Sequence, residues 1–153
     1  MVEDERRREI SGKVADPDLV RLFDYWRARH RGQLLPGRRD IDPIDLAFIL
    51  GDMVLLDVLR DPLRFRYRLV GANIVMRSSR DNTGVMVHEH PDLEFRPTAL
   101  RFYRSIAAGA RPDAERRNMI TDDQVRRYEI LGLPLAADGK TVDMILVGLK
   151  YAD

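Results

Sequence analysis

The chain has 153 residues, which suits one domain with its own hydrophobic core. Its 26 Lys and Arg residues nearly balance its 25 Asp and Glu residues, and a net charge of +1 gives no overall field that would attract nucleic acid or an acidic membrane surface. The lack of cysteine excludes disulfides, iron–sulfur clusters, thiolate zinc sites and cysteinyl-flavin photochemistry.

The N-terminal sequence is charged, as in Glu3-Asp-Glu-Arg-Arg-Arg8, and lacks the apolar segment of a secretory signal. No apolar stretch approaches the roughly 20 residues that a membrane-spanning helix needs. We therefore expect a cytoplasmic protein that binds neither membrane nor nucleic acid. Residues 1–15 show no clear periodicity, which predicts a flexible or partly helical tail before a single domain at 16–153.

The first clear helix begins at Asp16-Pro17, because Asp caps free amides and Pro fits the first turn. Its apolar stripe consists of Leu19, Leu22, Phe23 and Trp26. Two compatible interpretations remain open. The stripe covers the sheet of its own chain, or it packs against a second copy in a homodimer.

Further elements follow from periodicity and turn residues. In chain order they are a short helix at 43–50, strands at 53–59 and 65–70, short helices and loops at 71–95, a helix from Pro97 to Gly109, and strands at 114–120, 125–135 and 142–151. Five strands with helices inserted after the second predict an α+β domain, with one antiparallel sheet and helices on one face.

Several short motifs recur in this order between about Leu19 and Tyr151. They are Phe23-Asp-Tyr-Trp26, Leu35-Pro36, Arg39-Asp-Ile-Asp-Pro43, Arg64-Phe-Arg-Tyr-Arg-Leu-Val-Gly71, Arg80-Asp-Asn-Thr-Gly84, Tyr128-Glu129, Leu133-Pro-Leu135 and Asp138-Gly-Lys-Thr-Val-Asp-Met144. Together they resemble a bacterial family of single-domain PAS-like proteins, the PAS_5 group. The resemblance implies a PAS-like five-stranded antiparallel sheet with helices on one face plus an N-terminal flanking helix. It implies a sensory or regulatory role and no particular reaction.

A PAS-like cleft between sheet and helices would be the place for a small-molecule ligand. Alternation in the second strand predicts that its apolar residues face this cleft and its arginines face solvent. The candidate lining residues are Tyr67, Leu69, Ile74, Arg77, Tyr103, Ile106, Leu131, Met144 and Leu146. Plain core packing is the alternative for the apolar members. An inward-pointing Arg77 would need an acidic partner, which a carboxylate ligand would supply.

The segment His88-Glu-His90 holds two of the three histidines. Two imidazoles at i, i+2 on an extended segment could share a metal, and one alone could ligate haem. The sequence offers no third ligand and no haem-attachment motif, so we expect exposed loop histidines and no metal or haem at His88 or His90.

Two classes of function remain open. The first is a regulatory PAS module, not an enzyme, that binds a small molecule or a protein partner and signals in trans, since the chain ends after its last strand without an output segment. A variant of it is a dimerisation adaptor whose pocket is filled by side chains. The second is a small enzyme with His88, Glu89 or Asp143 as general base, although no matched catalytic pair stands out.

Overall fold

The computed structural model describes residues 2–121 and 124–152. Its described helices are α1 (Val2–Lys13), α2 (Pro17–Ala28), α3 (Ala72–Ser78) and α4 (Phe95–Gly109), and its strands are β1 (Met53–Leu59), β2 (Arg64–Val70), β3 (Asp113–Thr121), β4 (Gln124–Leu135) and β5 (Met144–Tyr151). The strands form one antiparallel sheet in the order β2-β1-β5-β4-β3. The predicted fold class is confirmed.

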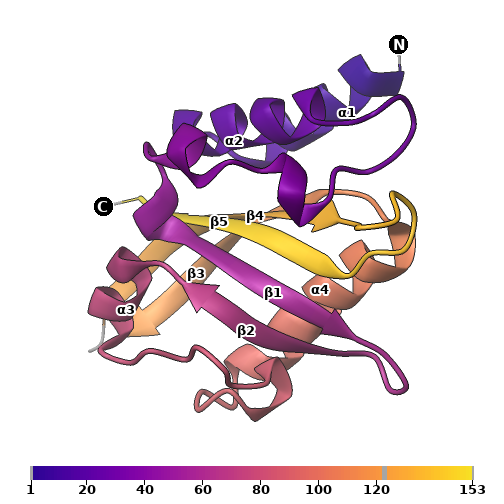
Figure 1. The fold of residues 1–153 in the computed structure, drawn as a ribbon. Coiled ribbons are helices and arrows are strands. Elements are labelled where there is room, and N and C mark those ends of the chain that lie inside the picture. Colours follow the sequence, from indigo (N-terminus) through magenta and orange to yellow (C-terminus); the bar gives the residue numbers. More distant parts are fainter. Residues whose placement is uncertain (1, 122–123, 153) are drawn as a thin grey trace.

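Helices cover both faces of the sheet (Figure 1). Helices α1 and α2 lie over one face, which we call the outer face, and α3 and α4 lie on the other, which we call the inner face. Each face has its own core cluster, one built around α2 and the other around α4. A ligand site is therefore expected on the inner face, where the short helices and α4 meet the sheet.

Most of the N-terminal segment is helical, which agrees with the partly helical alternative of the prediction. Helix α1 spans 12 residues, and Ile10 and the following Val14 are buried in the outer cluster. The Lys13 ammonium lies 2.8 Å from the carboxylate of Asp113 at the start of β3. These contacts fix the end of α1 against the edge of the sheet. Periodicity missed the helix because most of its residues are charged on every side.

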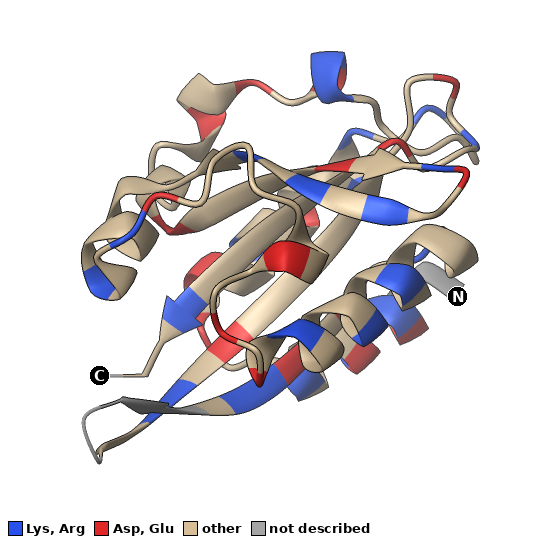
Figure 2. Ribbon diagram, turned by 90° about the horizontal axis from the view of Figure 1, so that it is seen from below, with Lys and Arg blue, Asp and Glu red and all other residues tan. Residues whose placement is uncertain are grey.

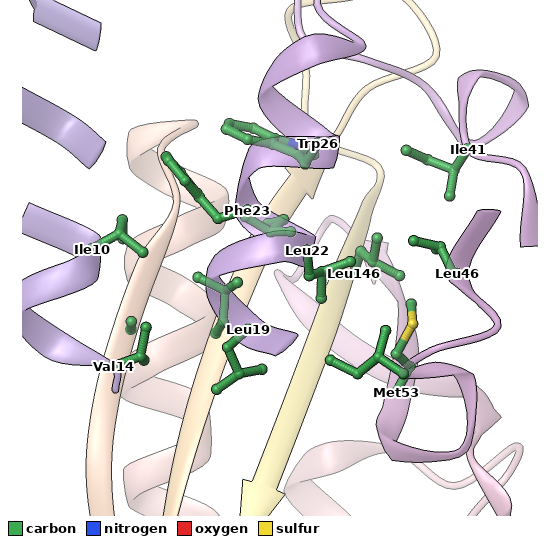
Figure 3. Packing of buried hydrophobic residues seen from close by; sticks show 14 of the residues in the cluster. Ile10, Val14, Leu19, Leu22, Phe23, Trp26, Ile41, Leu46, Met53 and Leu146 are labelled. Atoms are coloured by element: carbon green, nitrogen blue, oxygen red, sulfur yellow. The ribbon is translucent and has the colours of Figure 1, made fainter. Parts of the chain in front are cut away.

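Helix α2 starts as predicted, with the Asp16 carboxylate accepting a hydrogen bond from the Asp18 amide. Its stripe packs on the outer face of its own sheet, where Leu22 lies beside Leu146 of β5 (Figure 3). The Trp26 indole donates a 2.9 Å hydrogen bond to the Pro134 carbonyl.

Packing within the chain uses the whole of the α2 stripe. The buried members are Leu19, Leu22, Phe23 and Trp26, each at most 3% exposed. A side chain at Gly148 would meet Leu19 and Leu22 within 2.9 Å, so the helix lies close to the strand. The prediction of a dimer interface through these four residues is wrong, because the sheet of the same chain already covers them.

The remaining connections hold short helical turns. The helix expected at 43–50 is two turns of 3₁₀ helix instead, Pro43–Leu46 and Leu50–Asp52. The Asp42 carboxylate still caps the first of them through the Ile44 amide. On the inner side, α4 begins two residues before the predicted Pro97, which occupies its first turn.

Helix α4 lies close to β4 because Gly132 has no side chain. A Cβ atom at Gly132 would collide with Ile106 and would lie 3.1 Å from the ring of Phe102. This part of the cleft between helix and sheet is therefore filled by the protein's own side chains. Any ligand site on this face therefore lies away from Gly132.

Candidate functional site

Four predicted cleft residues do lie on the inner side. Tyr67 of β2 and Tyr103 and Ile106 of α4 are buried in the inner cluster, and Ile74 of α3 packs against it half-buried. Arg77 is exposed, and its guanidinium stacks 4.1 Å from the ring centre of Tyr151. Arg77 is therefore not the buried cation that the sequence suggested, although it lies at the same end of the sheet.

Three predicted lining residues belong to the outer face. Leu131 and Leu146 are buried under α2, and Met144 packs half-buried against the same cluster. Their neighbours Ile130, Ile145 and Val147 line the inner face instead. The prediction assigned these three residues to the wrong face of the sheet. Helices cover both faces of these strands, so the residues on both faces are apolar and no alternation distinguishes the inner face.

Leu69 is 56% exposed and does not line the cleft. In the pairing of β1 with β2, Leu55 lies opposite Leu69 and Leu56 lies opposite Tyr67, so no residue of β1 lies opposite Arg68. This bulge shifts the alternation by one residue. Phe65 and Tyr67 keep their inward direction, whereas Leu69 joins the opposite face at the exposed edge strand.

A polar cluster occupies the inner face beside the hydrocarbon core. Arg117 of β3 lies opposite Tyr128 of β4, which lies opposite Tyr151 of β5. Directly paired residues of antiparallel strands share a face. Tyr67 of β2 and Tyr103 of α4 belong to the same buried cluster as Tyr128, and Arg117 and Tyr128 both affect their pKa values.

The Arg117 side chain is only 8% exposed. Its Nε donates a 2.9 Å hydrogen bond to a carboxylate oxygen of Glu115, two residues earlier on the same face. Its guanidinium carbon lies 4.9 Å from the ring centre of Phe102 in α4. Both Nη1 and Nη2 are buried, and neither is in hydrogen-bonding geometry with an acceptor among the described residues. Two strong donors are thus left unpaired inside the fold. The Tyr128 phenol is nevertheless near enough to raise the pKa of Arg117 through a side-chain hydrogen bond.

Electrostatics keep this cluster positively charged. Burial acts to lower the pKa of Arg117, but neighbouring Tyr128 and Glu115 outweigh it and the pKa is raised from its ordinary value. Burial raises the pKa of Tyr67 and that of Tyr103, and Tyr128 raises both further. The phenols therefore remain protonated donors at neutral pH, around a permanent cation.

An open groove of about 770 Å³ lies at this end of the sheet. Arg117, Tyr128 and Tyr151 line it from the inner layer, and residues of the outer layer line it as well, among them Ala15, Asp16, Arg116, Glu129 and Lys150. The rings of Tyr128 and Tyr151 are 5.5 Å apart. A second groove of about 440 Å³ shares Tyr151 and is also lined by Arg77. A row of two arginines with two tyrosines between them thus connects the inner face to solvent.

The histidine segment shows no metal centre. The His88 ring is exposed and lies 3.4 Å from the carboxylate of its neighbour Glu89. The His90 ring is half-buried against Tyr67 and Phe95, and its Nδ1 accepts a hydrogen bond from the Asp92 amide. Within 2–121 and 124–152 no group of three His, Cys, Asp or Glu side chains could hold a metal ion.

The third candidate base, Asp143, caps the turn before β5 and accepts a hydrogen bond from the Ala137 amide. Lys and Arg residues and Asp and Glu residues are both spread over the ribbon in the view of Figure 2. No helix in the described part of the chain is long and apolar enough to cross a membrane. Among the described residues of the inner face, the polar cluster at Arg117 holds buried donors that the packing leaves without acceptors.

Sequence reasoning missed Arg117 because the pair Arg116-Arg117 looks like any solvated stretch of a strand. Arg116 does face the outer side, where it pairs with Glu129 at 3.0 Å. One signal was available: the hairpin of β3 and β4 places the second arginine opposite Tyr128. Two residues earlier, Glu115 supplies a partner on the same face.

Comparisons with known proteins agree with this fold. The PAS_5 family, described as a PAS domain, matches residues 14–149. The structure is similar to the PAS domain of BvgS from Bordetella pertussis, with a TM-score of 0.53, 16% identity, and coverage of 71% of this chain and 85% of that one. It is also similar to a sensory box sensor histidine kinase from Vibrio cholerae, with a TM-score of 0.45, 14% identity, and coverage of 72% and 92%.

No curated protein matches the sequence. The family match spans nearly the whole chain, from the end of α1 to the end of β5, and agrees with the five-stranded sheet. The chain therefore belongs to the PAS_5 family of PAS domains.

Proposed function

We propose that this PAS domain is a sensory module that binds a small molecule at the inner face and signals to a protein partner in trans. The observation that carries the proposal is the polar cluster of Arg117 with Tyr67, Tyr103 and Tyr128, set beside a groove. Buried polar groups cost free energy unless they are hydrogen-bonded. A cluster with unpaired donors is stabilised when a ligand supplies the missing acceptors.

Signalling would follow from a shift between two states of the domain, which a ligand produces only if it binds one of them better. Tyr128 belongs to the inner cluster and its neighbour Glu129 faces the outer layer, and both line the groove at the end of the sheet. The Glu129 carboxylate accepts hydrogen bonds from the Ala15 and Asp16 amides, at the junction of α1 and α2. A change at the cluster therefore has a short covalent route to the helices on the other side.

Other interpretations fit the structure less well. A ligand-free adaptor needs a cleft filled by side chains, which holds near Gly132 but leaves the Arg117 donors unpaired. An enzyme based on His88 and Glu89 would use an exposed pair on a single turn of 3₁₀ helix, Val87–Glu89. The predicted homodimer remains part of the proposal, through surfaces other than the α2 stripe.

Native mass spectrometry of the freshly purified chain tests the proposal. We expect an adduct of small-molecule mass, or one that forms when the low-molecular-weight fraction of a cell extract is added. A bare protein mass under both conditions, with no change in melting temperature, would contradict sensing and favour the adaptor. Consumption of a compound in the extract, lost in His88→Ala, would favour the enzyme.

A further inference from the structure

We propose that the ligand is a small monocarboxylate, held end-on by Nη1 and Nη2 of Arg117. This inference rests on the proposed sensory function and specifies the chemistry of its site. The two unpaired nitrogens point to an acceptor, because a guanidinium is donor only and cannot lose its proton in a protein. An orphaned, nine-tenths buried arginine next to a groove is the start of an anion site.

The geometry of the guanidinium selects a carboxylate. Glu115 already occupies the Nε side, at 2.9 Å. The edge that remains carries Nη1 and Nη2, which present two parallel donors. Two carboxylate oxygens match such an edge in a bidentate pair, which is shorter and stronger than a neutral hydrogen bond.

The charges in direct contact with the guanidinium favour a single negative charge. Glu115 is shared between Arg117 and Arg101, whose Nη1 lies 3.5 Å from the other carboxylate oxygen. These three side chains carry one net positive charge. A monoanion neutralises them, whereas a phosphate dianion would leave a negative charge that is partly desolvated. Phosphate is therefore an outcome of the test and not the expected ligand.

Aromatic rings around the guanidinium indicate the chemistry of the group attached to the carboxylate. The Phe102 ring lies on one side of the guanidinium, and Tyr128 and Tyr151 line the groove beside it. Rings favour an apolar or aromatic group attached to the carboxylate. The Nη atoms have no solvent contact of their own, so binding includes a small movement of the groove wall. Because binding requires this movement, it changes the conformation of the domain, as a sensor needs.

The experiment is isothermal titration calorimetry in a carboxylate-free buffer at fixed ionic strength. The probes are acetate, butyrate and benzoate, their neutral amides, and inorganic phosphate. We expect at least one carboxylate to bind while its amide does not. In Arg117→Gln the affinity for that carboxylate falls about tenfold or more, as expected for a lost charge-assisted pair.

The control variant is Arg104→Gln, which makes the same charge change at an exposed position of α4. It should leave the affinity unchanged. Arg117→Lys keeps the charge and loses the paired donors, so we expect affinity between that of the unchanged chain and that of Arg117→Gln. Circular dichroism of each variant establishes that it is folded.

Several results would overturn the assignment. They are binding of amide and carboxylate alike, preference for phosphate, equal binding by Arg117→Gln, and no binding by any of the three carboxylates. An adduct seen by mass spectrometry that binds Arg117→Gln as well as the unchanged chain would reject the carboxylate site while leaving the sensory function standing. Absence of any ligand would reject both.

Discussion

Methionine in place of Arg117 removes the buried guanidinium and keeps an unbranched apolar side chain in its place. The change removes two unpaired donors, each of which costs roughly 1–3 kcal/mol while it stays unsatisfied. It also removes the hydrogen bond to Glu115, which contributes about 1.5–3 kcal/mol. The contact with the Phe102 ring contributes about 0.5–2 kcal/mol more.

The gains and losses of Arg117→Met nearly cancel, so we expect the free energy of unfolding of the ligand-free protein to change by less than about 1.5 kcal/mol. Glu115 tolerates the loss because Arg101 still lies beside it. A fully paired buried ion pair behaves differently, since removing one partner costs about 3–5 kcal/mol. The small effect is thus specific to an arginine with unpaired nitrogens.

Urea unfolding followed by fluorescence measures the difference, because Trp26 is the single tryptophan and is buried. In a domain of this size 1 kcal/mol corresponds to about 2–4 °C in melting temperature, so calorimetry gives an independent value. A loss above about 3 kcal/mol would refute the reasoning, since it would show that the nitrogens already have partners in the free protein.

Three further predictions concern packing and pH. Gly132→Ala should destabilise the protein by about 1–3 kcal/mol through collision with Ile106, and adding Ile106→Val should recover part of the loss in urea unfolding; an additive double variant would contradict the contact. Leu22→Ala should cost about 2–5 kcal/mol in the same assay, and a change under about 1 kcal/mol would show that the stripe is not buried within the chain. Burial lowers the pKa of His90, so as the pH drops below 6.5 the unfolded chain takes up a proton on this ring before the folded protein does, and the stability falls. His90→Gln should therefore make the urea midpoint less dependent on pH between 7.5 and 5.5. Parallel plots of urea midpoint against pH for the variant and the unchanged chain would contradict this.

The element order was predictable from the sequence because helix starts and strand ends carry local signals. Asp16-Pro17 begins α2 as expected, and Phe65 and Tyr67 face inward as alternation predicts. Such signals act within a few residues, where propensity and hydrogen bonding decide. The PAS-like architecture followed from this order together with the motifs.

The details of the site were less predictable because they depend on contacts between distant segments. Alternation cannot show that a bulge at Arg68 turns Leu69 away from the cleft. It also cannot separate Leu131 from Ile130 when helices cover both faces. Arg117 acquires its importance only when β3 pairs with β4 and Phe102 closes over it, neither of which a local pattern contains.

The position of Glu129 has a mechanical consequence. Burial raises the pKa of this carboxyl, but hydrogen bonds from the Ala15 and Asp16 amides and the neighbouring Arg116 lower it by more, so the group is a firmly charged anchor. Its chain neighbour Tyr128 belongs to the opposite layer. Adjacent residues of β4 thus contact the inner cluster and the junction of α1 and α2, so a displacement of β4 at Tyr128 would also displace the Glu129 carboxylate from the Ala15 and Asp16 amides.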